Sequence, residues 1–410
     1  MLKNIFKYIQ TFLKWILLAL IIGAAGGIVG SLFHESIDYV TNLRSKTPWI
    51  IYFLPLGGLA IAGMYRIFKS QGKLDTNRVI DSVNGDEKVP LVTVPLIFIS
   101  TVITHFLGGS AGREGAAIQL GGSMGYNFGK ALRLKKGDIH IIVMSGMSAV
   151  FSALFGTPVA AALFAIEVSS VGVMHYAALV PSMVSSVTAY IIANWFGISP
   201  VRYAVSFPDT VAIMTILKTV VLSALAAIVA ICFCCAIKKS EQYFKKWIKN
   251  RFLRTFVGGC AIVAATMLVG NLDYNGAGTD IIARAMTGQT KPEAFVLKII
   301  FTALTIASGF KGGEIVPAFF IGSTFGCVVA PLIGLDPALG AAIGFVALFC
   351  GVVNCPVASL VLALEVFGGQ GILIFGITCA VSYMMSGNFG LYKSQKIVYS
   401  KLNTNYIDEN

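Results

Sequence analysis

The stretch "GGSAGREGAAIQLGGSMG", residues 108–125, carries the strongest indication of the fold of this chain. It places Arg113 and Glu114 side by side among glycines, and apolar runs flank it on both sides. A charged side chain at the centre of a bilayer costs about 2.5–3.5 kcal/mol on insertion scales. Charged residues within apolar segments therefore indicate a binding site or a transport pathway.

The composition indicates an all-α polytopic membrane protein. The chain of 410 residues is 56% hydrophobic and only 12% charged, whereas soluble domains carry about 25% charged residues. Several apolar runs are shorter than the roughly 20 residues that a full crossing needs, and Gly or Pro breaks many of them, which is typical of transporters with discontinuous helices. The runs cover residues 15–29, 50–62, 91–107, 139–155, 179–196, 211–237, 256–269, 295–307, 316–332, 339–364 and 372–385.

The net charge of +12 follows the positive-inside rule and does not indicate nucleic-acid binding. We expect a multi-pass protein of the plasma (inner) membrane with both termini cytoplasmic and with an uncleaved N-terminal helix, because "GAAGGIVGSLF" continues the first apolar run without a cleavage site. Segments 197–210 and 271–280 are poor in Lys and Arg and are expected outside. The basic clusters expected inside are Lys3, Lys7 and Lys14; Lys130, Arg133, Lys135 and Lys136; residues 238–254; and Lys393, Lys396 and Lys401.

Neither the cysteines nor the histidines form a metal-ligand pattern. The eight Cys lack CxxC spacing, and Cys232, Cys234 and Cys235 are expected to be buried thiols in an apolar helix. The four His have no ligand spacing, so we expect no metal and no cofactor. A membrane-embedded enzyme is a weak alternative, since HExxH and GxSxG motifs are absent from the sequence.

The chain contains an internal repeat. "GTPVAAALFAIEV" (156–168) and "NCPVASLVLALEV" (354–366) share six of thirteen positions at an offset of 198 residues, which places Glu167 over Glu365. "AGREGAAIQLGGS" (111–123) and "KGGEIVPAFFIGS" (311–323) match at an offset of 200. We therefore predict two homologous halves, 1–205 and 206–410, and the distribution of basic residues predicts that they are inverted relative to the membrane.

Each half then carries a glycine-rich break followed by a helix start. Such irregular backbone is tolerated at membrane depth only where it is buried in protein or lines a cavity. Helix N-termini favour anions, and inverted repeats place a substrate site near the midplane between the copies. Close helix packing explains the glycines but not Glu114 or Glu314, whose carboxyl groups can bind protons or take the place of an anion.

These motifs resemble those of the CLC family of anion channels and proton-coupled anion antiporters, over nearly the whole chain. "GREGA" resembles the family's GREGP motif, in which Glu114 matches the gating glutamate, and "GGEIVP" resembles its GGxFxP motif. "GTPVAAALFAIEV" resembles the stretch with the inner proton-transfer glutamate, and Tyr392 in "GLYKS" matches the anion-coordinating tyrosine. The resemblance implies a fold of two inverted repeats with tilted and broken helices, and a homodimer with one pathway per subunit. No pair of cytoplasmic CBS domains is expected before Asn410.

The departures from the family pattern resemble its fluoride-exporting branch, whose members are fluoride/proton antiporters. The chloride members' GSGIP motif is missing from "GKLDTNRVIDSV" (72–83), where Thr76 is matched to the coordinating serine and Asp75 and Asn77 are rivals. Val168 stands where chloride/proton antiporters place a second glutamate. Glu314 replaces an apolar residue of GGxFxP.

We therefore predict a fluoride/proton antiporter that exports fluoride through the bilayer at about one fluoride per proton. Fluoride is strongly hydrated and needs good hydrogen-bond donors, such as protonated carboxyl groups, to replace its water. A chloride-selective transporter and a passive anion channel on the same fold remain alternatives. The expected gating and proton-transfer residues are Glu114 and Glu314, and the expected anion-binding residues are Thr76, Asn77, Gly112, Arg113, Gly115, Gly313, Glu314, Ile315, Val316 and Tyr392.

Other charged residues have structural interpretations. Arg113 is expected to pair locally or to bind backbone carbonyls and so to position its loop. Glu167 and Glu365 are expected to be helix-end charges that face water or an interface. A salt bridge to Lys311 is the structural alternative to a transport role for Glu314.

Overall fold

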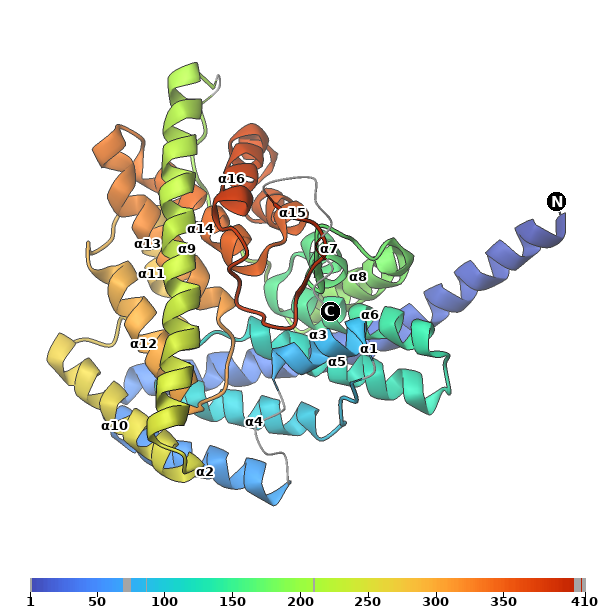
Figure 1. Cartoon of the computed structure of the whole chain (residues 1–410), viewed down its shortest axis with the longest axis horizontal. Coiled ribbons are helices and arrows are strands. Elements are labelled where there is room, and N and C mark those ends of the chain that lie inside the picture. Colours follow the sequence, from blue (N-terminus) through green and yellow to red (C-terminus); the bar gives the residue numbers. More distant parts are fainter. Residues whose placement is uncertain (1, 69–74, 86, 209–210, 402–406, 408–410) are drawn as a thin grey trace.

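Two successive series of helices build the chain, as Figure 1 shows for the computed structural model. The structure describes residues 2–68, 75–85, 87–208, 211–401 and 407. Three parts of the expectations lie outside the described residues: 72–74 of the stretch matched to the coordinating region, 209–210 of an expected external segment, and Asn410. The first series is α1 (Leu2–Lys46), α2 (Leu54–Ile67), α3 (Thr76–Asn84), α4 (Thr93–Phe106), α5 (Glu114–Ala131), α6 (Lys136–Phe155), α7 (Pro158–Glu167) and α8 (Leu179–Trp195).

The second series repeats the order of long and short helices. It consists of α9 (Ile213–Trp247), α10 (Arg251–Val269), α11 (Thr279–Met286), α12 (Ala294–Ser308), α13 (Ile315–Val329), α14 (Pro337–Val353), α15 (Pro356–Phe367) and α16 (Ile372–Met385). Short 3-10 helices cover Pro48–Phe53, Tyr176–Ala178, Ala330–Ile333 and Gly369–Gly371. Two-residue strands β1 (Ser170–Val171) and β2 (Lys396–Ile397) pair in parallel and attach the C-terminal segment to the first half of the chain.

The helix lengths fit a membrane protein with interrupted spans, and the all-α fold class is confirmed. Seven helical segments among the described residues are long and apolar enough to cross a membrane, while six further apolar helices have only 10–17 residues. The apolar run 339–364 proves to be two helices, because Asn354 adopts a left-handed conformation (φ 58°) and Pro356 begins a new helix.

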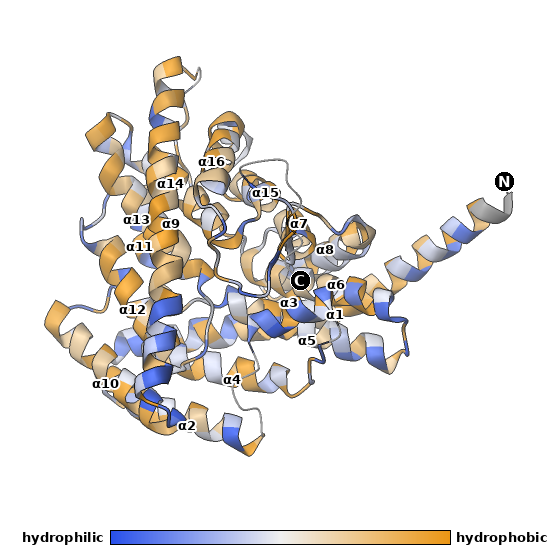
Figure 2. Ribbon diagram, in the orientation of Figure 1, coloured by the Kyte–Doolittle hydropathy of each residue, from blue (hydrophilic) through white to orange (hydrophobic). Residues whose placement is uncertain are grey.

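The outer surface is apolar and the interior is densely packed. Figure 2 shows hydrophobic residues over most outward helix faces, with hydrophilic residues gathered at the end of α9 beside α2 and α10. The N-terminal part of α1 projects away from the other helices (Figure 1), and its Phe6 is exposed. In the part of the chain described, Cys234 is buried and Cys235 half-buried, but Cys232 is exposed on the outside of α9, contrary to expectation.

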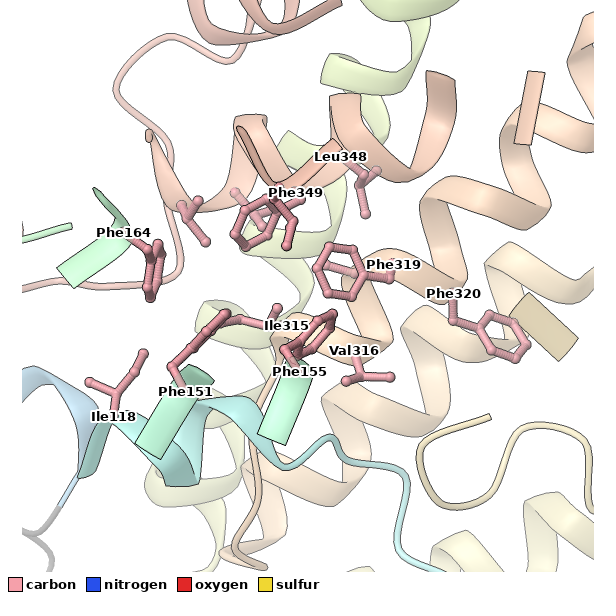
Figure 3. Close-up of a cluster of buried hydrophobic side chains, with 14 of the residues drawn as sticks. Ile118, Phe151, Phe155, Phe164, Ile315, Val316, Phe319, Phe320, Leu348 and Phe349 are labelled. Atoms are coloured by element: carbon pink, nitrogen blue, oxygen red, sulfur yellow. The ribbon is translucent and has the colours of Figure 1, made fainter. Parts of the chain in front are cut away.

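An apolar cluster lies where the two series meet. Figure 3 shows Ile118 of α5, Phe151 of α6 and Phe164 of α7 beside Ile315 and Phe319 of α13. Phe319 stacks on Phe345 of α14 with ring centroids 3.9 Å apart. The starts of α5 and α13 are therefore fixed against a rigid core.

Candidate functional site

The two glycine-rich breaks pair with each other at the centre of the molecule. The N–H groups of Gly112 and Gly313 each donate to the other residue's carbonyl at 2.6 Å, forming an isolated antiparallel bridge. An added Cβ on Gly313 would lie 2.3 Å from the nitrogen of Gly115, so only glycine fits there. This bridge brings the starts of α5 and α13 together, and with them Glu114 and Glu314.

Glu114 lies folded over the start of its own helix. Its side chain is 1% exposed, and Oε2 accepts a hydrogen bond from the Arg113 N–H at 3.0 Å. The Arg113 guanidinium lies 3.7 Å from Glu114 Oε1 and donates to Asp38 at 2.9 Å. The expected local pairing of Arg113 is confirmed, since its guanidinium lies against the carboxylates of Glu114 and Asp38.

Glu314 lines a cavity of about 570 Å³ to which Glu114 does not contribute. Glu314 is half-buried and precedes the first turn of α13. The cavity also receives Thr76 and Asn77 from α3, Gln119 from α5, and Tyr392 from the C-terminal segment. Four predicted site residues, from three segments far apart in the sequence, therefore share one cavity: Thr76, Asn77, Glu314 and Tyr392.

The cavity is electropositive. Its charged residues are the cations Arg66, Lys238, Lys245, Arg251, Arg254, Lys311 and Lys393 and the acids Asp75, Glu241 and Glu314. Lys245 and Lys393 both pair with Glu241, at 2.5 and 3.1 Å. The excess of cations attracts anions toward Glu314.

Lys311 does not neutralise Glu314. Its Nζ lies 4.9 Å from the centre of the Tyr65 ring, and no ion pair joins it to Glu314 within the described residues. The salt-bridged helix start is therefore not the arrangement of this chain.

Hydrogen bonds join the start of α3 to α5 and to the C-terminal segment. Thr76 Oγ1 donates to the Gly115 carbonyl at 3.3 Å and accepts from Gln119 Nε2 at 3.1 Å. Asn77 Oδ1 accepts from the Ser394 N–H at 3.2 Å. Asp75 caps α3 by accepting from the Arg78 N–H at 3.1 Å, so this rival is a helix cap and offers no donor to an anion.

Tyr392 presents an unused hydroxyl group to the cavity. The residue is 5% exposed, and its Oη has no hydrogen-bond partner among the described residues. The Leu391 N–H donates to the Val352 carbonyl, and Gln395 Nε2 donates to the Val353 carbonyl at 2.8 Å. The backbone around Tyr392 is thus held while its hydroxyl lacks an acceptor, which an anion can supply.

Ile315 and Val316 face away from the cavity. Both side chains belong to the apolar cluster of Figure 3, at 0% and 4% exposure. Any contact of these residues with an anion is therefore limited to their backbone N–H groups at the start of α13.

Of the two surroundings expected for Glu167 and Glu365, water or an interface, the structure shows the interface between the two halves of the chain. Glu167 is 6% exposed and accepts from the N–H groups of Val357 and Ala358, at 3.2 and 2.8 Å. Glu365 accepts in the same way from Val159 and Ala160, at 3.1 and 2.8 Å. Glu167 of α7 thus caps α15, and Glu365 of α15 caps α7, which are corresponding helices in the two halves of the chain. At each helix start, free N–H groups and the helix dipole stabilise a negative charge.

Neither Gln119 nor any of the seven cavity cations was predicted as a site residue. Gln119 lies five residues after Glu114 and is the only polar side chain in "GAAIQLGG" (115–122), a signal that helical periodicity could have used. Arg66, Arg251 and Arg254 belong to basic or interfacial segments whose folding toward the site depends on how α2, α9 and α10 pack. Nothing local in the sequence indicates that packing.

Residues 57–387 match the family model described as voltage-gated chloride channel. The chain belongs to this family, the CLC family. It is 35% identical to the "Chloride/fluoride channel protein" of Pseudomonas syringae pv. tomato, in an alignment that covers 95% of this chain and 87% of the relative. The H(+)/Cl(-) exchange transporter ClcA of Salmonella paratyphi B is 23% identical, with 93% and 87% covered.

Solved structures of CLC proteins have the same fold. The crystal structure of a CLC-type fluoride/proton antiporter superposes with a TM-score of 0.90 at 33% identity, covering 94% of this chain and 98% of the other. A slow cyanobacterial Cl-/H+ antiporter superposes with a TM-score of 0.78 at 20% identity, covering 91% and 94%.

Proposed function

We propose that this CLC protein is a fluoride/proton antiporter that exports fluoride from the cytoplasm. The observation that carries the proposal is the pairing of two acid-bearing helix starts, with Glu314 open to an electropositive cavity and Glu114 folded over the start of its own helix. An acid at each of the two helix starts allows protons and an anion to compete for the same short path.

The comparisons support fluoride over chloride as the anion. The relative at 35% identity has fluoride in its name, and the structure at 33% identity is a fluoride/proton antiporter. The chloride exchangers share only 23% and 20% of their residues with this chain. Glu314 supports the same choice, because a protonated carboxyl is a strong donor for a small, strongly hydrated anion.

The proposed roles divide the site into acids and donors. Glu114 and Glu314 exchange protons, and Tyr392 Oη together with the side chain of Asn77 donates hydrogen bonds to fluoride. The backbone N–H groups of Gly115, Ile315 and Val316 lie at the two helix starts, whereas those of Gly112 and Gly313 are used in the bridge that holds the two starts together. Thr76 acts by positioning α3 against Gly115, since its hydroxyl hydrogen is engaged there.

The membrane arrangement is also part of the proposal. The basic residues at the cavity, at the start of α1 and at the end of α9 favour a cytoplasmic position for the cavity and for both termini, in a plasma membrane. The reciprocal caps of Glu167 and Glu365 and the Gly112–Gly313 bridge support two inverted repeats, 1–205 and 206–410. A homodimer with one pathway per subunit is expected from the family.

The test is the reversal potential of purified protein in liposomes that hold opposed fluoride and pH gradients. For wild type we expect a reversal potential that moves with the pH gradient and fits about one fluoride per proton. Glu114→Gln should abolish fluoride-driven proton movement, because an amide cannot titrate.

Glu35→Gln is the matched control, because Glu35 is an exposed acid of α1 outside the cavity. Exchange in this variant should equal that of wild type. A wild-type reversal potential set by fluoride alone would identify a channel, and equal fluoride and chloride fluxes would favour the chloride alternative.

A further inference from the structure

Three buried polar atoms at the cavity have no hydrogen-bond partner among the described residues: the donor Arg254 Nε, the Tyr392 hydroxyl Oη and the acceptor Gln119 Oε1. Their chemistry differs. A tyrosine hydroxyl can donate to an anion, whereas an amide oxygen only accepts and is repelled by an anion. The Tyr392 hydroxyl can therefore bind the anion, whereas Gln119 Oε1 requires a hydrogen-bond donor as its partner.

The neighbours of Gln119 fix the orientation of its amide. Nε2 lies 3.1 Å from Thr76 Oγ1 and 3.4 Å from the Gly115 carbonyl oxygen. Because the Gly115 oxygen can only accept, the amide nitrogen and not the oxygen must face it. Oε1 consequently points to the opposite side of the amide, and the residue is 5% exposed.

Gly115 also places Glu314 close to Gln119. An added Cβ on Gly115 would lie 3.3 Å from Glu314 Oε2, while the carbonyl of the same glycine contacts the Gln119 amide. Glu314 and Gln119 line the same cavity. When protonated, the Glu314 carboxyl is a hydrogen-bond donor in this part of the cavity. When ionised, it would face Gln119 Oε1, which is also an acceptor.

We propose that Gln119 is a positioning residue that accepts the hydrogen bond of protonated Glu314 and keeps the proton there while no anion is bound. Arriving fluoride then takes the place of Gln119 Oε1 as the acceptor. This inference rests on the proposed exchange of fluoride for protons. Fluoride is then bound on the Tyr392 side of the cavity, and the proton is held on the Gln119 side.

Other charged and titratable groups lie around Glu314: most line the same cavity, and Glu114 lies at the neighbouring start of α5. They are Lys311 of its own loop, Glu114 of α5, Asp75 before α3, Arg66 of α2, Lys238, Glu241 and Lys245 of α9, Arg251 and Arg254 of α10, and Tyr392 and Lys393 of the C-terminal segment. A change at Gln119 leaves all of these charged groups in place.

The experiment measures fluoride/proton exchange in liposomes at equal pH on both sides, from about pH 5 to pH 8. Gln119→Met keeps the length of the side chain and removes its polar atoms. Loss of one acceptor should move the half-maximal pH of exchange downward by about half to one unit.

Ser123→Ala is the matched control. Ser123 lies one turn further along α5, is buried, and donates to the Pro90 carbonyl at 3.0 Å outside the cavity. It should lower stability slightly without moving the pH profile. Gln119→Asn, which withdraws the amide by one methylene, replaces Gln119→Met if that variant does not fold.

Infrared difference spectra between low and high pH give a second readout that does not require transport. A protonated-carboxyl band that is absent in Glu314→Gln should move to higher frequency in Gln119→Met. An unchanged pH midpoint and an unchanged band would overturn the proposal and leave water as the partner of Oε1. Wild type without fluoride/proton exchange would instead defeat the proposed function.

Discussion

At the scale of single residues, Gly313 sets how closely the two helix starts approach. A methyl group there would lie 2.3 Å from the Gly115 nitrogen and 3.0 Å from its Cα, both of which are backbone atoms that cannot rotate away. Gly313→Ala should therefore break the bridge to Gly112, lower the free energy of unfolding by about 1–3 kcal/mol and abolish exchange. Thermal unfolding in detergent and liposome flux measure the two effects.

Gly63→Ala is the corresponding control within α2, where an added Cβ meets nothing within 4 Å. It should leave exchange unchanged and raise stability by up to about 1 kcal/mol, because alanine is the better helix former. Wild-type exchange in Gly313→Ala would show that the close approach is not needed for transport.

At the scale of elements, α7 and α15 depend on each other for their caps. Both begin with a proline, and their N-cap residues Thr157 and Cys355 make no side-chain cap bond. The free N–H groups are instead satisfied by Glu365 and Glu167 from the opposite half. Glu167→Ala should lower the free energy of unfolding by about 2–3 kcal/mol, since it leaves two buried N–H groups unpaired.

Glu365→Ala should cost less, because Glu365 is only half-buried and water can reach part of its site. The comparison is made by thermal unfolding under the same detergent conditions. Equal, negligible losses in both variants would mean that the caps contribute nothing to holding the two halves together.

At the scale of the whole molecule, the seven cavity cations come from α2, α9, α10, the loop before α13 and the C-terminal segment. Their combined field should speed the entry of fluoride, and salt should screen it. At low fluoride, the initial rate from this side should fall about three-fold or more when impermeant salt rises from about 0.01 M to about 0.3 M. Removing two of these charges with Arg66→Gln and Arg254→Gln should lower both the rate and its salt dependence.

Lys130→Gln with Lys135→Gln removes the same charge from exposed positions that do not line the cavity. This pair should leave the rate and its salt dependence as in wild type. If both double variants lost the same fraction of the rate and of its salt dependence, net charge and not the cavity would be the cause.

The amino-acid sequence was enough to predict the membrane class, the glycine breaks, the internal repeat and the two acids at the helix starts. These features depend on residues that are close together in the sequence, because hydropathy, glycine content and motif spacing are properties of short segments. The family resemblance added Tyr392 and the region of Thr76, and both line the cavity. A repeat also predicted that equivalent helices meet, which the Gly112–Gly313 bridge bears out.

The contacts of each charged group depend on how the helices pack and could not be predicted from the sequence. Glu167 and Glu365 end helices of the same motif, and nothing in that motif shows that each carboxylate reaches the N-terminus of the other's helix. Gln119 lies at the cavity because α3, α5 and the loop before α13 come together at Gly115. Such contacts join residues tens to hundreds of positions apart, so they depend on how the helices pack and not on the local pattern of the chain.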